Sequence, residues 1–203
     1  MKRFFAGVAL AVSFASAAIA QEAPDALVRN VSEEVLTIVK NDKDLQSGNT
    51  KRAMELVEAK VLPHFNFNRM TRLALGREWN KASEPQKEQL VKEFRTLLVR
   101  TYSNALTEYK NQTIEYKPLR MAAGDTDVMV KTLVNQPGGK PITLDYWLEK
   151  QAEGWKVYDV VVASVSLVTN YRDTFAQEVR NGGIDGLIKT LAAKNIKSAE
   201  KKG

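Results

Sequence analysis

The sequence predicts a single α+β domain, in which helices at both ends of the chain pack against a twisted antiparallel sheet of about four strands. Apolar residues recur with the 3.6-residue period of a helix up to about residue 109, with the two-residue period of a strand between 114 and 162, and with the helical period again to about 194. Short links between the strands favour an antiparallel meander. Separate runs of helices and strands are typical of the α+β class.

Four helices are predicted before the sheet. They span approximately residues 24–42, 49–61, 66–76 and 83–109. Pro63 ends the second helix, because proline has no backbone N–H to donate and its ring clashes with the preceding turn. The fourth helix has the clearest start, because Ser83 and Gln86 have the spacing of a capping box and Pro85 lies in the first turn.

The predicted strands span residues 114–117, 128–134, 142–149 and 155–162. Turn-forming prolines and glycines lie at 137–141, and Glu153-Gly154 forms the last hairpin turn. Two helices follow, from about 165 to 180 and from about 184 to 194, with Gly182-Gly183 between them. Residues from about 196 to 203 are expected to form a polar, frayed tail.

The first twenty residues have the layout of a secretory signal peptide. Met1-Lys2-Arg3 is positively charged, residues 4–18 form an uncharged apolar run, and Ala18-Ile19-Ala20 is a small-x-small cleavage signal. We therefore expect export to the periplasm, cleavage after Ala20, and a mature chain of residues 21–203 that forms one domain. The chain has no cysteine, which excludes disulfides and thiol chemistry, and the cleavage signal without a cysteine fits a periplasmic protein better than a lipoprotein.

The predicted mature chain has a small positive net charge. Removal of Lys2 and Arg3 leaves 28 basic and 24 acidic residues, a net charge of +4. This permits attraction to anionic surfaces, but it does not indicate a nucleic-acid partner. A monomer is the default expectation.

One face of the strands and the stripes of the flanking helices supply the candidate lining of an apolar interior. Its members are Phe94, Leu98, Tyr102, Val128, Val130, Ile142, Leu144, Tyr146, Leu148, Val160, Val162, Leu167, Tyr171 and Phe175. Periodicity alone does not distinguish a solid core from a lined cavity. We expect Phe65, Phe67 and Met70, with Leu73 and Leu75, to help close this interior.

Few residues suggest catalysis or metal binding. His64 is the only histidine, and one histidine cannot build the usual zinc site, so no metal or cofactor is expected. Asp159 lies among apolar strand residues. It is interpreted either as half of a structural ion pair with Arg172 or another arginine of the adjoining helix, which we favour, or as a carboxylate with a raised pKa that acts as a general base.

The stretch around residue 70 is basic. Arg69, Arg72 and Arg77 form either a solvated helix face or a positive rim that meets lipid phosphates or an acidic partner.

Four segments carry a family resemblance. They are "FNFNRMTRLALGREW", "FRTLLVRTYSNAL", "DYWLEKQAEGWKVYDVVV" and "SVSLVTNYRDTF…NGGIDGLIKTLAAKN". In this order they resemble the MlaC, or toluene-tolerance, family of periplasmic phospholipid-binding proteins, over residues 27–195. The chain departs from the family pattern at Ala163-Ser164, where an acidic residue and a glycine are expected, and this puts in doubt any role of that turn.

The resemblance implies an NTF2-like fold and a carrier that holds a glycerophospholipid with its acyl tails inside. It also implies that the carrier shuttles between an outer-membrane lipoprotein–porin complex and an inner-membrane ABC transporter with an MCE-domain subunit. This transport would maintain the lipid asymmetry of the outer membrane. Exposing two tails of roughly 30 methylenes to water would cost on the order of 25 kcal/mol. A carrier therefore needs a dry cavity, and it needs no nucleophile.

Two other functions stay open at this point. One is an NTF2-like enzyme, such as an isomerase or hydratase, with Asp159 as its general base. The other is an adaptor with a solid core, which acts only by docking to partners. The amount of bound lipid separates the three functions, and a structure without a cavity would favour the adaptor.

Overall fold

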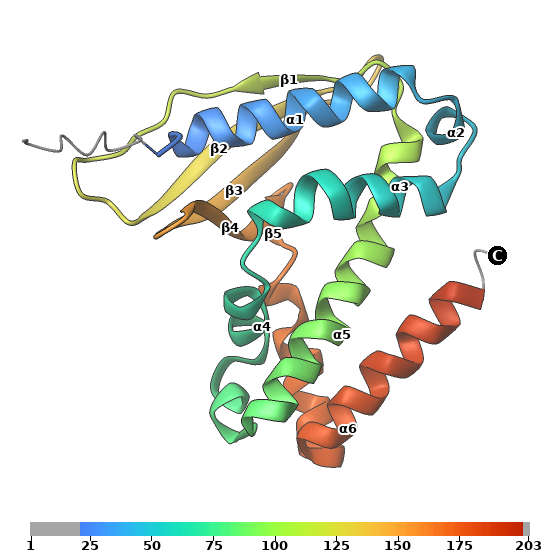
Figure 1. The fold of residues 1–203 in the computed structure, drawn as a ribbon, viewed down its shortest axis with the longest axis vertical. Helices are drawn as coiled ribbons and strands as arrows, with labels where there is room; N and C mark the ends of the chain where they lie inside the picture. The colour runs from blue at the N-terminus through green and yellow to red at the C-terminus, as the bar shows by residue number, and fades with distance from the viewer. Residues whose placement is uncertain (1–20, 201–203) are drawn as a thin grey trace, which may run out of the picture.

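The computed structural model describes residues 21–200, and the predicted signal peptide lies outside this part of the chain. Its helices are α1 (Pro24–Asn41), α2 (Lys43–Gln46), α3 (Thr50–Leu56), α4 (Phe67–Leu75), α5 (Glu84–Tyr102) and α6 (Arg172–Glu200). Its strands are β1 (Thr113–Tyr116), β2 (Asp127–Asn135), β3 (Ile142–Gln151), β4 (Gly154–Val162) and β5 (Val165–Ser166). Figure 1 shows two lobes, a sheet with α1 and α3 beside it and a bundle of α4, α5 and α6, with α5 running between them.

The five strands form an antiparallel meander in the order β1-β2-β3-β4-β5. The alternation predicted from the sequence is confirmed by the register, in which Val128 lies opposite Leu148 and Val130 lies opposite Tyr146. Tyr146 in turn lies opposite Val160 on β4. The predicted apolar residues of neighbouring strands therefore share one face of the sheet.

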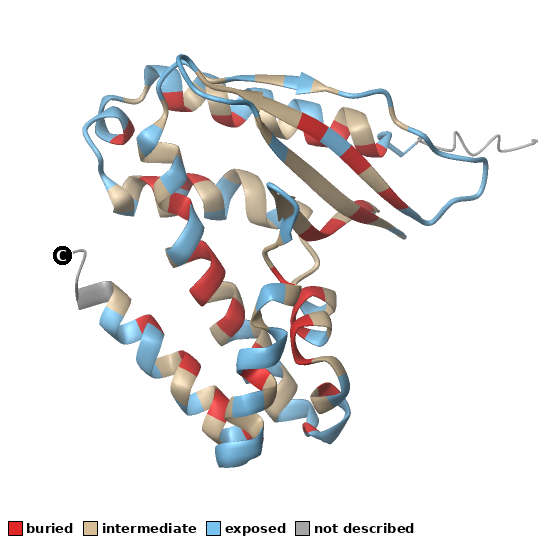
Figure 2. Cartoon of the chain, turned by 180° about the vertical axis from the view of Figure 1, so that it is seen from behind, coloured by how far each residue is buried: buried red, intermediate tan, exposed pale blue. Residues whose placement is uncertain are grey.

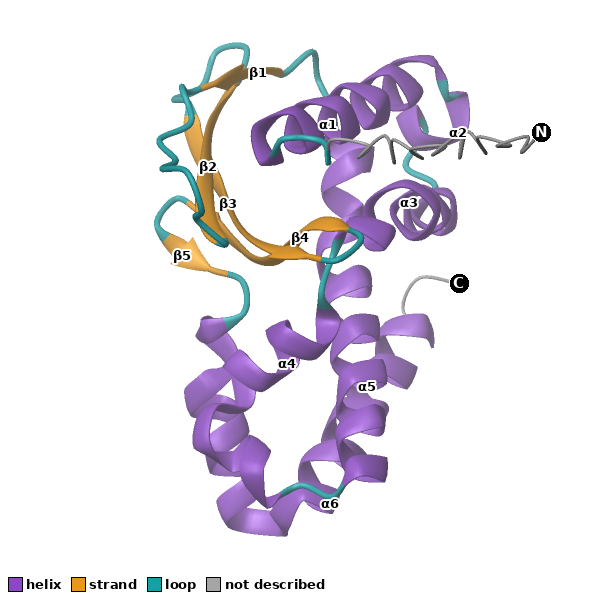
Figure 3. Ribbon diagram, turned by 60° about the vertical axis from the view of Figure 1, so that its left-hand side comes forward, coloured by secondary structure: helices purple, strands orange, loops and turns teal. Residues whose placement is uncertain are grey.

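The sheet curls strongly, and α1 lies within the curve (Figure 3). A register shift between Trp147 and Leu148 on β3 marks a β-bulge, which bends the strands locally. Leu27 and Val28 of α1 are buried against Val128 on the concave face. The first helix and the sheet therefore form one layered lobe, because each buries its apolar side against the other.

The chain turns back directly after β4, where the sequence predicted a helix from residue 165. Instead, Val165 and Ser166 pair with Val162 and Val161 as a fifth strand, and α6 begins only at Arg172. The prediction of about four strands was therefore one short. A two-residue strand has no periodicity that would reveal it.

The turn between β4 and β5 uses an unusual backbone conformation. Ala163 and Ser164, which depart from the family pattern, have positive φ angles of 48° and 70°. Side chains with a Cβ rarely adopt such angles, whereas glycine does so without strain. The glycine expected from the family pattern at position 164 would relieve this strain.

The helices agree with the prediction at their starts better than at their ends. Ser83 and Gln86 form the predicted capping box, in which the Ser83 amide donates to Gln86 Oε1 over 2.9 Å. α5 ends at Tyr102, where the sequence predicted about 109, and a 3₁₀ segment, Ser103–Glu108, continues it. A backbone break at Gly183, with φ of 67°, divides α6 as predicted, but its second part continues to Glu200.

The segment before α4 is also irregular. The predicted helix 49–61 is α-helical only to Leu56, after which Val57–Val61 form a π-helical turn and Leu62–His64 a 3₁₀ turn. Pro63 lies at the point where the helix breaks down, as expected from its missing N–H.

Each lobe has its own buried cluster. In the bundle, Phe94 of α5 meets Phe175 of α6 edge to face at a ring-centroid distance of 5.2 Å. In the sheet lobe, Val130 and Leu148 lie under α1. Buried residues lie along one side of α5 and on strands β2 and β4 (Figure 2). A third cluster joins α1 to α2 and α3 around Val39, Leu45 and Leu56. The candidate site adjoins these clusters.

Candidate functional site

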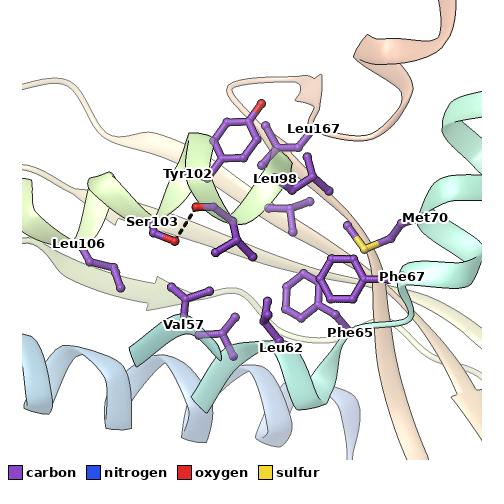
Figure 4. A pocket seen from close by; sticks show the side chains of 13 residues that line it. Val57, Leu62, Phe65, Phe67, Met70, Leu98, Tyr102, Ser103, Leu106 and Leu167 are labelled. Atoms are coloured by element: carbon purple, nitrogen blue, oxygen red, sulfur yellow. Dashed lines mark hydrogen bonds between the residues drawn. The ribbon is translucent and has the colours of Figure 1, made fainter. Parts of the chain in front are cut away.

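Two apolar cavities adjoin each other, one beside α5 and one between α1 and the sheet. The α5 cavity has a volume of about 220 Å³ and the α1 cavity about 240 Å³. The α5 cavity is lined by Val57, Val61, Leu62, Phe65, Phe67, Met70, Leu98, Val99, Tyr102, Ser103, Leu106, Val160 and Leu167 (Figure 4). The α1 cavity is lined by Leu27, Val28, Val31, Ser32, Val35, Leu36, Val61, His64, Phe65, Leu106, Ile114, Leu144, Tyr146 and Val157.

The two cavities share a wall. Val61, Phe65 and Leu106 line both of them. These residues come from the π-helical turn, from the link before α4 and from the 3₁₀ segment after α5, so the wall consists of irregular backbone and side chains rather than of a regular element. The two cavities are therefore adjoining compartments of one apolar space.

Hydrogen bonds to β4 on either side of Phe65 hold it in this wall. The amide of Asn66 donates to the carbonyl of Val157 over 2.8 Å, and Lys156 Nζ donates to the carbonyl of Pro63 over 2.7 Å. The break at Pro63 lets the chain turn from the π-helical turn into α4. Phe65 then stacks on Phe67 at a ring-centroid distance of 6.0 Å, and both rings face the α5 cavity (Figure 4).

The walls offer hydrocarbon and few free polar groups. In the α5 cavity, the Ser103 hydroxyl donates to the carbonyl of Val99 over 2.6 Å, so it is satisfied within its own helix turn. Burial and the nearby Lys156 lower the pKa of His64, which lines the α1 cavity, so its imidazole is neutral at neutral pH. Such a space can hold apolar chains away from water.

Within residues 21–198, no group of three or more histidine, cysteine or acidic side chains lies close enough together to hold a metal ion. Within the same part of the chain, no helix is both long and apolar enough to span a bilayer.

The structure separates the predicted lining residues into several settings. Leu98, Tyr102, Val160 and Leu167 line the α5 cavity, and Leu144 and Tyr146 line the α1 cavity. Val128, Val130 and Leu148 are packed under α1, and Phe94, Tyr171 and Phe175 belong to the core of the bundle. Ile142 and Val162 lie half-buried near the ends of their strands and line neither cavity.

Sequence reasoning missed much of the lining. The segments 24–42 and 49–61 were predicted only as helices, and none of their residues was placed in the lining; Leu62 was not a candidate either. Their apolar character was visible, but their position beside empty space was not, because the same periodicity describes a filled core. Of the five residues expected to close the interior, Phe65, Phe67 and Met70 line the α5 cavity, whereas Leu73 and Leu75 pack in the bundle.

The three predicted basic residues have different surroundings. Arg69 is only 24% exposed, and its guanidinium donates to Glu149 over 2.5 Å and to Asp127 over 2.6 Å. It also stacks over the ring of Tyr158 at 3.5 Å. Arg69 therefore joins α4 to the sheet. Arg72 and Arg77 are exposed on the bundle and line neither cavity.

The predicted ion pair between Asp159 and Arg172 is wrong. Asp159 Oδ2 accepts a hydrogen bond of 2.5 Å from the hydroxyl of Ser166, whereas Arg172 donates to the carbonyl of Leu73. The hydroxyl oxygen of Ser166 also accepts from the amides of Val168 and Thr169, so Ser166 can satisfy the carboxylate and the backbone together. Asp159 lines neither cavity.

A comparison with known protein families decides the relationship. Residues 29–193 match the profile of the family described as MlaC protein.

The chain belongs to the MlaC family.

Two curated relatives carry names from the same family. The chain is 26% identical over 174 residues to the intermembrane phospholipid transport system binding protein MlaC of Haemophilus influenzae, a match that covers 84% of this chain and 81% of the relative. It is also 26% identical over 184 residues to the toluene tolerance protein Ttg2D of Pseudomonas putida, covering 90% and 84%.

A solved structure extends this comparison to the fold. The phospholipid-binding protein of Ralstonia solanacearum, solved in complex with a phospholipid, is 41% identical, with a TM-score of 0.80 over 86% of this chain and 98% of that one. The predicted α+β class and NTF2-like fold are confirmed by this likeness, with five strands in place of about four.

Proposed function

We propose that this MlaC-family chain is a non-catalytic phospholipid carrier, whose α5 and α1 cavities hold the acyl tails of a glycerophospholipid. The observation that carries the proposal is the pair of adjoining apolar cavities with a common wall. The likeness to a protein that was solved with a phospholipid bound supports it. We also propose that the predicted lining residues that face these cavities, such as Leu98 and Leu144, contact the tails.

The two cavities suit a transfer between membranes. A tail that leaves a bilayer for a dry protein cavity exchanges one apolar medium for another, so the transfer avoids the cost of about 0.8 kcal/mol for each methylene exposed to water. Each cavity is smaller than the roughly 300 Å³ at which ligand pockets usually begin. We therefore infer that side chains of the shared wall, Phe65 above all, move when a lipid enters.

Export and partners form the finer part of the proposal. We infer that the chain works in the periplasm and carries phospholipid between an outer-membrane lipoprotein–porin complex and an inner-membrane ABC transporter with an MCE-domain subunit, which maintains outer-membrane asymmetry. Arg72 and Arg77 are exposed on the bundle, away from the cavities, and are candidates for contact with acidic surfaces of these partners.

The alternative in which Asp159 is a general base has little support. A base must reach its substrate, and the Asp159 side chain is buried, lines neither cavity and is engaged by Ser166. The adaptor alternative requires a solid interior, which two cavities argue against.

Transfer of labelled phospholipid between donor and acceptor vesicles tests the carrier function. Leu144→Glu places a charge in the α1 cavity, so we expect transfer and bound lipid to fall at least tenfold, because the tails would have to desolvate the carboxylate. Thr143→Glu is the matched control, since Thr143 is the next residue on β3 and is exposed. Equal transfer by wild type and Leu144→Glu, with both folded, would count against the proposed function.

A further inference from the structure

Three hydroxyl groups gather beside the otherwise apolar α1 cavity. Ser32 of α1 and Tyr146 of β3 line the cavity directly. Tyr116 of β1 packs on the same concave face, against the cluster that Tyr146 also contacts. The Ser32 hydroxyl interacts with both tyrosine hydroxyls, so the three groups converge at one place.

One of the three hydroxyls, that of Tyr116, is a buried donor without a well-placed acceptor within residues 21–198. Burial raises the pKa of Tyr146 to about 12 and also raises the pKa of Tyr116, so both stay protonated at neutral pH. A buried donor without an acceptor is costly, and native structures usually supply a partner.

We propose that Ser32, Tyr116 and Tyr146 form an ester-recognition niche, in which the tyrosine hydroxyls donate to an ester carbonyl of the bound phospholipid. This inference rests on the proposed carrier function. A tail inside the α1 cavity passes along apolar walls and, at the niche, meets neutral donors. The glycerol esters are the neutral acceptors that lie between the tails and the headgroup of such a lipid.

The charges outside the niche agree with this orientation. The Arg29 guanidinium lies 4.1 Å from the centre of the Tyr116 ring and is half-exposed, with Glu33 at 3.8 Å. A lipid whose ester is held at Tyr116 would place its phosphate near Arg29, in contact with water. The niche would thus fix the depth at which the tails stop, while the headgroup stays outside.

Competition between ester and ether lipids tests this recognition. Delipidated full-length mature protein is mixed with equal amounts of a diacyl and a dialkyl phosphatidylethanolamine of the same chain length, and the bound species are counted by native mass spectrometry. The dialkyl lipid has the same tails and headgroup but no carbonyl. We expect wild type to prefer the diacyl lipid roughly fivefold, because the net free energy of one ordinary hydrogen bond changes a binding constant by about that factor.

Single-atom variants locate the preference. Tyr116→Phe and Tyr146→Phe remove one hydroxyl each and keep the rings, so each should lower the ratio, and the double variant should bring it close to one while both lipids still bind. Tyr109→Phe is the matched control, because Tyr109 packs in another cluster and lines neither cavity; it should keep the preference.

Three results would overturn the inference. Equal binding of the two lipids by wild type would mean that an ordered water satisfies the niche. Loss of the preference in Tyr102→Phe, but not in Tyr116→Phe, would mean that the ester binds beside Tyr102 in the α5 cavity and not at the niche. Binding of neither lipid would reject the carrier function itself, and the inference with it.

Discussion

Asp159 is a buried carboxylate in β4 that the proposed function does not use. Its Oδ2 has Ser166 as a partner, while its Oδ1 is buried without a hydrogen-bond partner among residues 21–198. Burial raises the pKa of this carboxyl, and the hydrogen bonds that favour the charged form do not offset it. The group therefore favours the folded state when it is protonated and disfavours it when it is charged.

Replacement of Asp159 by asparagine should reveal this effect through its pH dependence. A raised folded pKa gives a contribution that is fully present below the unfolded pKa of about 3.9 and is lost as the pH rises through the folded pKa. Asp159→Asn keeps an acceptor for Ser166 but cannot ionise. Its unfolding free energy relative to wild type, from urea titrations, should therefore increase from about pH 4 to about pH 7. A constant difference would contradict the buried-charge interpretation.

Ser164 offers a second test at the scale of one residue. Its φ of 70° is strained for a side chain with a Cβ. Ser164→Gly should raise the unfolding free energy by roughly 0.5–1 kcal/mol, because the relieved strain of about 1–2 kcal/mol exceeds the entropy that glycine loses on folding. The urea midpoint measures this gain.

Ser164→Ala is the control for that variant. It removes the hydroxyl but keeps the Cβ, so it should leave the midpoint almost unchanged. A gain of equal size in the two variants would assign the effect to the hydroxyl instead of the backbone.

Single residues were predictable where their role is local. The capping box of Ser83 and Gln86 depends on a three-residue spacing, and the sequence displays it. Arg69 was not predictable, because its partners Asp127 and Glu149 are 58 and 80 residues away in the chain. Asp159 was assigned the wrong partner for another reason. Ser166 is only seven residues away, but it was predicted to begin a helix, whereas it forms the short strand β5 beside β4.

At the scale of elements, Arg69 links α4 to the ends of β2 and β3. Its partner Glu149 is 17% exposed and also accepts from Asn66 Nδ2 over 2.5 Å. Arg69→Gln should lower the unfolding free energy by roughly 2 kcal/mol, which lies between the values for exposed and buried ion pairs, because Glu149 would lose its cation. Urea titration gives the loss.

Arg72→Gln is the matched control for the link. Arg72 is exposed on the same helix, so its loss should change stability by no more than about 0.5 kcal/mol. Similar losses in the two variants would show that the charge of α4, and not the contact with the sheet, is responsible.

Long regular elements were predictable and short irregular ones were not. The four longer strands followed from alternation, since a half-buried strand must present one apolar face. The strand Val165–Ser166 and the π-helical turn Val57–Val61 are too short to show a period. These irregular pieces matter for function, because the π-helical turn supplies Val61 to the wall between the cavities.

At the scale of the whole molecule, the α5 cavity lies where α4, α5 and the segment 57–65 meet β4, and the α1 cavity lies between α1 and the concave face of the sheet. Their lining comes from α1, the segment 57–70, α5 and the concave face of the sheet, which are distant in sequence. A cavity volume is a small difference between the space enclosed by elements and the volume of their side chains. Periodicity fixes which side chains face inward, but it does not fix this difference.

The central claim is that this space holds the tails of a phospholipid. Native mass spectrometry of the mature protein, purified from bacteria without detergent, measures it directly. We predict an added mass of about one phospholipid for each chain, which organic solvent releases as intact diacyl lipid. Protein that carries no lipid, and that takes up none from vesicles, would contradict the claim.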